Sequence, residues 1–181
     1  MTDSKIKIGI SLRITNAEQY SEKRDALSHD WTLFFEGINV FPVLIPNTIS
    51  NVREFLEKMQ LDGFLLSGGD NIGDNSDRDK TEQEIIRFGL DNNLPIFGVC
   101  RGMQAINKYF HGDIEILTNS KHVGKPHSVK IINSNFSSLL KTSSIEVNSY
   151  HNNIIKQDIL GDELEPFALS SEDETIEGFF H

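Results

Sequence analysis

The sequence predicts an α/β fold, with a single domain over residues 1–181 and a mostly parallel central sheet flanked by helices. Strand-like and helix-like segments alternate over roughly the first 110 residues, which favours a sheet covered on both faces. Two of the expected helices open with capping-box patterns. The length of 181 residues is that of one ordinary domain.

Short apolar runs predict the strands. Ile6, Ile8 and Ile10 recur at period two and indicate a first strand. After Gly112 the helical pattern gives way to short strands, and no internal repeat, low-complexity tract or linker is evident. The further strands that we expect cover residues 40–45, 63–66, 94–99, 128–132, 145–147, 167–170 and 176–180.

The helices are predicted from their caps and from apolar residues at helical spacing. Asn51 with Glu54 has the pattern of a capping box, and the helix that follows it carries apolar residues on one face. Thr81 with Glu84 has the same pattern, so we expect a second helix to begin there. The other expected helices cover residues 31–38 and 102–110. Trp31, Phe34 and Phe35 have helical spacing and are expected in the core, with a pocket lining as the alternative.

The charge balance excludes several classes of function. The chain has 17 Lys and Arg against 27 Asp and Glu, a net charge of −10 at pH 7. Such a surface repels phosphate backbones and anionic lipids, so we expect neither a nucleic-acid nor a membrane partner. No apolar run reaches the ~18 residues of a membrane span, and the start lacks a secretion signal. With only one cysteine, we expect a cytoplasmic protein.

The most informative stretch surrounds that cysteine. A buried strand runs into Gly98-x-Cys100-x-Gly102 and then into a helix, which is a nucleophile elbow with Cys in place of Ser. The sharp turn strains the nucleophile's backbone, and flanking glycines remove the Cβ atoms that would clash. The N–H of Arg101 would then face an oxyanion on the attacked carbonyl. The alternative interpretation, that Cys100 is an ordinary small core residue, does not account for the glycines on both sides of it.

A second strand ends in the Gly68–Gly69 turn. Two glycines there let backbone amides approach a ligand closely, so this turn is a candidate for the second oxyanion donor. A plain turn after a strand remains the alternative at this point.

The acidic segment 70–79 resembles a calcium loop but lacks its pattern. Counted from Asp70, position six is Asn75 rather than Gly, and position twelve is Thr81 rather than Glu. We therefore expect a solvated loop. None of the six histidines has ligand spacing to a second histidine or to the cysteine, so we expect no metal and no cofactor.

A polar cluster over residues 147–153 follows a short strand. Its side chains suit recognition of a small polar ligand, although a surface loop of that composition is common.

Together these stretches resemble the class I glutamine amidotransferase-like superfamily, which is flavodoxin-like in fold, and within it the γ-glutamyl hydrolase branch. Arg101, directly after the nucleophile, is typical of that branch. The resemblance extends over nearly the whole chain. The matching stretches, in chain order, are Ser67-Gly-Gly-Asp70, Arg78-Asp79 with Glu82, Gly98–Gln104, His122-Val with His127, and Val147–His151.

The resemblance implies roles for these residues. Cys100 would attack the γ-carbonyl of a γ-glutamyl amide and form a thioester, while the amides of Gly69 and Arg101 hold the oxyanion. Water would then release glutamate. The compact chain is most similar to the γ-glutamyl-CDP-amidate hydrolases of capsule phosphoramidate synthesis and also resembles γ-glutamyl-γ-aminobutyrate hydrolases. The residues expected to bind the substrate are Gly68, Gly69, Arg101, Gln104, Ser149, Tyr150 and His151.

One feature departs from the family pattern. Members complete a Cys–His–Glu triad with a His-Pro-Glu motif after the last strand, and no His-x-Glu follows Cys100 in this sequence. The triad His and Glu are therefore not present in this chain. We expect the full protein to continue past His181; the alternative is an enzyme without the usual base. Neither His151 nor His181 matches the position of the family histidine.

Two other functions stay open. A glutaminase subunit would pass ammonia to a synthetase on another chain, and a catalytically dead member would bind γ-glutamyl ligands as a regulator. A cysteine α/β-hydrolase is disfavoured, because too little chain follows the nucleophile for that fold's acid and histidine. The small-molecule amide is the expected partner, and the sequence does not reveal the oligomeric state.

Overall fold

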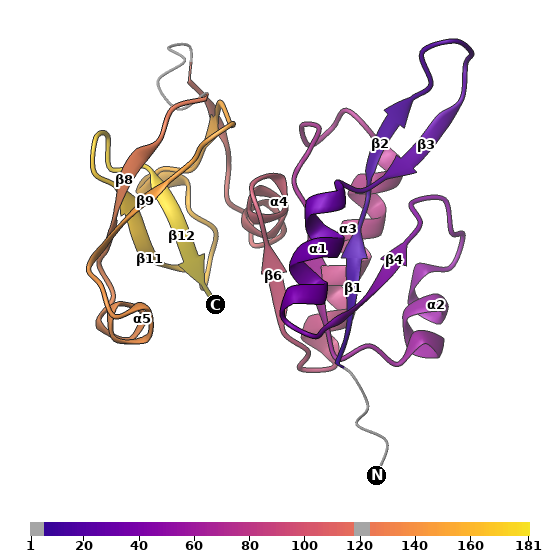
Figure 1. Ribbon diagram of the computed structural model, residues 1–181, viewed down its shortest axis with the longest axis horizontal. Coiled ribbons are helices and arrows are strands. Elements are labelled where there is room, and N and C mark those ends of the chain that lie inside the picture. Colours follow the sequence, from indigo (N-terminus) through magenta and orange to yellow (C-terminus); the bar gives the residue numbers. More distant parts are fainter. Residues whose placement is uncertain (1–5, 118–123) are drawn as a thin grey trace. The chain divides into compact units, whose positions relative to one another are not determined.

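The structure is a computed structural model that describes residues 6–117 and 124–181 (Figure 1). The chain forms two compact units, one up to Ile106 and one from Asn107 onward. Each unit is described by itself. The expected motif residue His122 lies outside the described residues.

The N-terminal unit contains the parallel sheet that the sequence predicts. Its strands lie in the order β4-β1-β5-β6, and all neighbours are parallel. The central strand β5 is buried at every position, which explains its continuous apolar sequence. The strands are β1 (Lys7–Ser11), β4 (Phe41–Ile45), β5 (Gly63–Leu66) and β6 (Ile96–Gly98).

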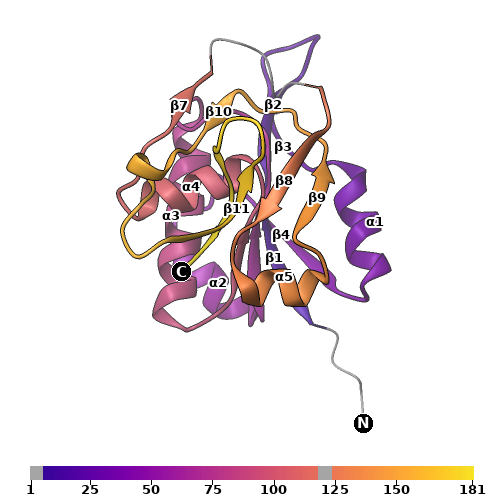
Figure 2. The same ribbon diagram turned by 90° about the vertical axis from the view of Figure 1, so that its left-hand side faces the viewer.

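Helices cover both faces of this sheet. Figure 2 shows α1 on one side of the strands and α2 and α3 on the other. Residues Ile10, Phe35 and Leu65 form the core under α1, and Phe64 packs edge-to-face on Phe88 on the side of α3. The helices are α1 (His29–Gly37), α2 (Val52–Met59), α3 (Ser76–Asp91) and α4 (Arg101–Tyr109).

Two predicted helix starts have different outcomes. The cap at Asn51 is confirmed, because its side chain accepts a hydrogen bond from the N–H of Glu54 at 3.1 Å. The predicted start at Thr81 is wrong, because α3 begins at Ser76. Thr81 is buried within the helix, and its hydroxyl donates to the carbonyl of Asn47 at 3.2 Å. Asp77 lies in the first turn instead, where the helix dipole favours a carboxylate.

A two-stranded antiparallel ribbon follows β1 and was not predicted. It joins β2 (Arg13–Asn16) to β3 (Lys23–Ala26). Most of its residues are exposed, so it lacks the apolar alternation by which strands are recognised.

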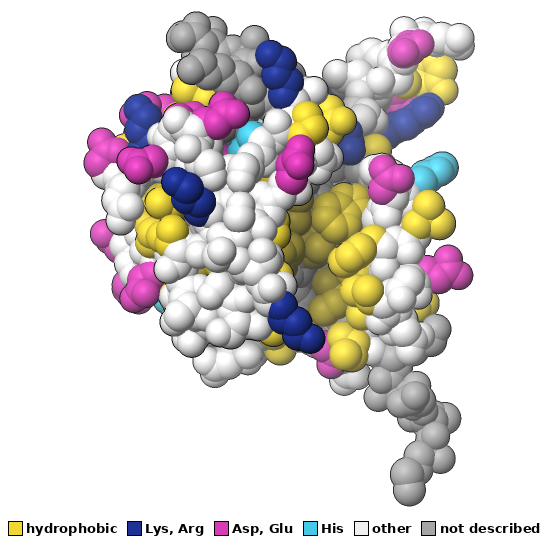
Figure 3. All heavy atoms as spheres, turned by 60° about the vertical axis from the view of Figure 1, so that its left-hand side comes forward, with side chains coloured by type: hydrophobic (Ala, Val, Ile, Leu, Met, Phe, Trp, Pro, Cys, Tyr) yellow, Lys and Arg dark blue, Asp and Glu magenta, His cyan; other side chains and the backbone are white. Residues whose placement is uncertain are grey.

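An apolar groove of about 690 Å³ lies between α1 and β6. Trp31, Phe34 and Phe35 all line the groove. Phe35 is buried and Trp31 packs partly buried against the core, as expected, whereas the expectation of a core position for Phe34 is wrong because its side chain is 52% exposed. Figure 3 shows hydrophobic side chains gathered on this face of the unit.

The C-terminal unit is built on an antiparallel sheet with strand order β12-β11-β8-β9. Val129, Ile131 and Ala168 form its core, and Phe136 from α5 stacks on Phe167 with ring centroids 4.0 Å apart. The predicted short strands are confirmed. The elements are β7 (Glu115–Ile116), β8 (His127–Ile131), α5 (Ser134–Leu140), β9 (Ser144–Val147), β10 (Asn153–Ile154), a 3₁₀ turn (Gln157–Ile159), β11 (Glu165–Ser170) and β12 (Ile176–Phe180).

No helix among the described residues is long and apolar enough to cross a membrane.

Candidate active site

Cys100 lies in the turn between β6 and α4, where the sequence predicts an elbow. Its φ angle is +54°, a left-handed conformation that costs free energy for a residue with a Cβ atom. The side chain is exposed, and the carbonyl of Cys100 accepts a hydrogen bond from the N–H of Gln104. The strained, accessible thiol at a helix N-terminus is the geometry of a nucleophile elbow.

The flanking glycines are required by close backbone contacts. A Cβ atom on Gly98 would lie 2.6 Å from the carbonyl carbon of Gly102. A Cβ atom on Gly102 would lie 2.1 Å from the carbonyl oxygen of Leu66, at the end of β5. The first turn of α4 therefore packs directly against β5, and only glycine fits at either position.

The Gly68–Gly69 turn lies beside the cysteine. A Cβ atom on Gly68 would be 3.4 Å from the Cβ and 3.9 Å from the Sγ of Cys100. Gly69 has φ of +138°, which L side chains rarely adopt. Two sharp turns from the neighbouring strands β5 and β6 thus meet at Cys100. The carboxyl edge of a parallel sheet is the usual position of a ligand site in such folds.

A buried ionic network lies under these two turns. The side chains of Arg78, Glu82 and Arg101 are at most 1% exposed. Glu82 accepts hydrogen bonds from Nε of Arg78 at 2.9 Å and from Nη1 of Arg101, and Ser11 donates to the same carboxylate at 2.8 Å. The guanidinium of Arg101 is therefore held inside the network by Glu82 and Asp79.

The acidic segment 70–79 takes part in this network through Asp70, Arg78 and Asp79, and its last four residues belong to α3, so its interpretation as a solvated loop is wrong there. Asp70 pairs with Nη1 of Arg78 at 3.0 Å, and Asp79 pairs with Nη2 of Arg101. The carboxylates face arginines that come together only in the folded chain, and this pairing has no signal in the local sequence.

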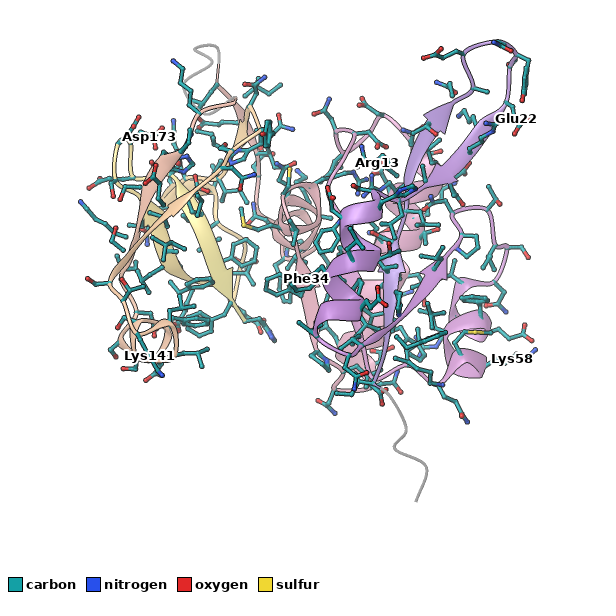
Figure 4. The ribbon with its side chains drawn as sticks, viewed as in Figure 1. Arg13, Glu22, Phe34, Lys58, Lys141 and Asp173 are labelled. Carbon is teal, nitrogen blue, oxygen red and sulfur yellow. The ribbon has the colours of Figure 1, made fainter. Side chains whose placement is uncertain are left out.

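Arg13, labelled in Figure 4, is the first residue of β2 and lies close to Gly69. Its Cβ is 3.1 Å from the position that a Cβ on Gly69 would occupy, and its side chain is exposed. The chain's other five arginines all form ion pairs with carboxylates, whereas Arg13 forms none within the part of the chain described. Arg13 was not predicted, because a single exposed arginine carries no local sequence signal.

The C-terminal unit contains a second cluster of titratable groups. Glu177 on β12 lies between two histidines: its Oε1 is 3.3 Å from Nε2 of His127 and its Oε2 is 3.8 Å from Nε2 of His151. The contact with Glu177 raises the pKa of His151, although burial of the ring opposes the rise. Nδ1 of the same ring lies 3.0 Å from the carbonyl oxygen of Asn153. Glu177 was not predicted; its only sequence signal is an acidic residue within a strand.

The remaining predicted ligand residues differ in exposure. Gln104, one turn after Cys100, is 4% exposed. In the C-terminal unit, Ser149 is buried, whereas Tyr150 is 76% exposed. Their role in a common site with Cys100 stays a prediction. Among the described residues, no group of three or more His, Cys, Asp or Glu side chains is arranged to hold a metal ion.

Comparison with known proteins decides the family. The family model for Peptidase C26 matches residues 7–181. The chain belongs to the peptidase C26 family. The expected class I glutamine amidotransferase-like relationship is thereby confirmed, and the comparisons support a hydrolase or amidotransferase-like enzyme.

Individual relatives of this C26 protein agree with that assignment. It is 33% identical to a γ-glutamyl-CDP-amidate hydrolase of Campylobacter jejuni, over 96% of this chain and 82% of the relative. A solved structure of a putative GMP synthase protein from Thermoplasma acidophilum superposes with a TM-score of 0.71 at 26% identity, over 98% of this chain and 78% of that one. A glutamine amidotransferase from Thermotoga maritima has the same TM-score at 14% identity, over 97% and 71%, and shows the fold alone.

Proposed function

We propose that this C26 protein hydrolyses a γ-glutamyl amide to glutamate and a free amine through a thioester on Cys100. The single observation that carries the proposal is the elbow: a left-handed, exposed Cys100 at the start of α4, beside the Gly68–Gly69 turn. Membership of the family and the similarity to a γ-glutamyl-CDP-amidate hydrolase support the γ-glutamyl substrate class.

The proposed reaction has two steps. The Sγ of Cys100 attacks the γ-carbonyl carbon, and the amides of Gly69 and Arg101 donate hydrogen bonds to the oxyanion that forms. The C–N bond then breaks, and the amine leaves with the proton that the Cys100 thiol has lost. Water attacks the thioester carbonyl and releases glutamate, which restores the thiol. In this account Gly68, Gln104, Ser149, Tyr150 and His151 bind the glutamyl part.

The leaving group is the finer part of the proposal. Similarity to the Campylobacter jejuni enzyme favours a nucleotide-linked amidate, such as γ-glutamyl-CDP-amidate in capsule phosphoramidate synthesis. Arg13, which pairs with no carboxylate among the described residues, lies beside the Gly69 turn and is consistent with an anionic leaving group. Arginine binds phosphate and carboxylate through two parallel hydrogen bonds.

A glutaminase that serves a synthetase is the second candidate function. Similarity to the putative GMP synthase protein of Thermoplasma acidophilum favours it, since such a chain would hydrolyse glutamine and deliver ammonia to a synthetase partner. In that case the leaving group is ammonia, and turnover depends on the partner.

One experiment separates these functions. Glutamate release is measured from a panel of γ-glutamyl amides that includes glutamine and a nucleotide-linked amide, with Cys100→Ser as the matched control. Release from one amide, abolished in the variant, is the expected result. Ammonia from glutamine only after a synthetase is added would favour the glutaminase function, and glutamate release that persists in Cys100→Ser would overturn the proposed mechanism.

A further inference from the structure

The buried network of Arg78, Glu82 and Arg101 connects the two turns that carry the proposed oxyanion donors. We infer that Glu82 is a positioning residue that orients both donors at once, the amide of Gly69 through Arg78 and the amide of Arg101 through its own side chain. This inference rests on the proposed function and adds a residue that never touches the substrate.

The first branch of the network fixes the turn after β5. Nη2 of Arg78 donates to the carbonyl oxygen of Ser67 at 2.8 Å and to that of Gly68 at 3.2 Å. In a trans peptide the C=O and the following N–H point in opposite directions. Because Arg78 holds the Gly68 carbonyl on the buried side, the N–H of Gly69 points out of the network. The turn needs this restraint, since glycines are otherwise free to rotate.

The second branch fixes the turn after β6. Arg101 directly follows the nucleophile and is the first residue of α4, so its N–H has no carbonyl partner within the helix. The guanidinium is anchored in α3, by Nη1 to Glu82 and by Nη2 to Asp79. A shift of this side chain would therefore shift the backbone of Arg101, which is covalently linked to Cys100.

Glu82 joins the two branches through different oxygens. Its Oε1 accepts from Arg78 and from the hydroxyl of Ser11, and its Oε2 accepts from Arg101. Ser11 Oγ in turn accepts from the N–H of Ser67 at 3.0 Å, so β1 is tied to the same turn. Removing the charge of Glu82 leaves each buried guanidinium with a single carboxylate, Arg78 with Asp70 and Arg101 with Asp79, and both turns lose their common anchor.

The test compares two reactions of Cys100 that differ only in their need for an oxyanion site. Acylation by p-nitrophenyl acetate passes through a tetrahedral oxyanion, whereas alkylation by iodoacetamide does not. Both rates are measured by intact mass in wild type, in Glu82→Gln and in Thr81→Val. Thr81 is the matched control, because it is a buried neighbour on α3 whose hydroxyl donates to the carbonyl of Asn47 rather than to either turn. Neither reagent requires the natural substrate.

Glu82→Gln is expected to lower the acylation rate at least tenfold and to change the alkylation rate less than about threefold. Loss of one oxyanion donor lowers kcat by about 10²–10³ in enzymes of this type, so hydrolysis of a γ-glutamyl amide should fall by about 10² with KM little changed. Thr81→Val should retain both rates.

Two results would overturn the inference. Unchanged acylation in Glu82→Gln would show that the network does not orient the donors, and a parallel loss of acylation and alkylation would show a structural role only. If Glu82→Gln folds poorly, Arg101→Lys is tested in its place, because it keeps the positive charge but loses one of the two ion pairs, with Glu82 or with Asp79. The ratio of its acylation rate to its alkylation rate is then the deciding measurement. A wild-type protein that is acylated yet hydrolyses no γ-glutamyl amide would refute the proposed function and leave this inference standing.

Discussion

A Cys100→Gly variant should be more stable than Cys100→Ala, although both remove the proposed nucleophile. The left-handed conformation at φ of +54° costs a residue with a Cβ atom about 1–2 kcal/mol. Glycine removes that cost but loses about 0.5–1 kcal/mol more conformational entropy on folding than alanine does. The difference predicts that Cys100→Gly is about 0.5–1 kcal/mol more stable than Cys100→Ala, which keeps the Cβ and the strain.

The assay is urea unfolding of both variants under identical conditions. For a chain of this size, 1 kcal/mol corresponds to about 2–4 °C in melting temperature, so thermal scans provide a second measure. The same pair of substitutions at Lys108, exposed in the helical part of α4, is the control and should show the opposite order, because glycine is about 1 kcal/mol worse than alanine within a helix. A Cys100→Gly variant less stable than Cys100→Ala would refute the strained elbow.

Three further predictions follow from the same structure. Gly102→Ala should destabilise the fold by about 3 kcal/mol or more, because its Cβ would lie 2.1 Å from a backbone oxygen. Gly37→Ala, whose Cβ would have nothing within 4 Å, should instead stabilise α1 slightly. Urea midpoints measure both variants, and equal midpoints would contradict the close packing at Gly102. Because Glu177 raises the pKa of His151, their contact stabilises the fold below the unfolded histidine pKa of about 6.5, and this contribution disappears as the pH rises through the raised pKa. Glu177→Gln should therefore cost more stability near pH 5 than near pH 9, and a pH-independent cost would refute the pairing. Arg13→Gln should raise KM about 10–100-fold for an amide with an anionic leaving group and leave KM for glutamine unchanged; equal effects on both would exclude leaving-group recognition.

Local sequence patterns predicted the sheet and the elbow because both depend on neighbouring residues. The strand, the glycines at 98 and 102 and the following helix are contiguous, and their geometry follows from sterics within a few residues. The expectation that this strand is buried was wrong, because β6 lies at the edge of the four-stranded sheet and Phe97 is 65% exposed. The apolar continuity of β5 likewise follows from burial on both faces of a parallel sheet.

The buried network was not predicted because its partners are distant in sequence. Glu82 and Arg101 are 19 residues apart, and Ser11 is 71 residues from Glu82. Arg78, Asp79 and Glu82 are charged residues that a sequence assigns to a solvated surface, and only the packing of α3 against the ends of β1 and β5 brings them inside. The pairing of Glu177 with His151 is hidden for the same reason.

The most direct test of the central claim is to trap the acyl-enzyme. The protein is mixed with the γ-glutamyl amide that it hydrolyses fastest, quenched in acid within the first turnover and digested, and the peptide that contains Cys100 is examined by mass spectrometry. We predict one glutamyl group on Cys100 in the wild type and none in Cys100→Ala. Glutamate release without that adduct, or release that persists in Cys100→Ala, would contradict the account.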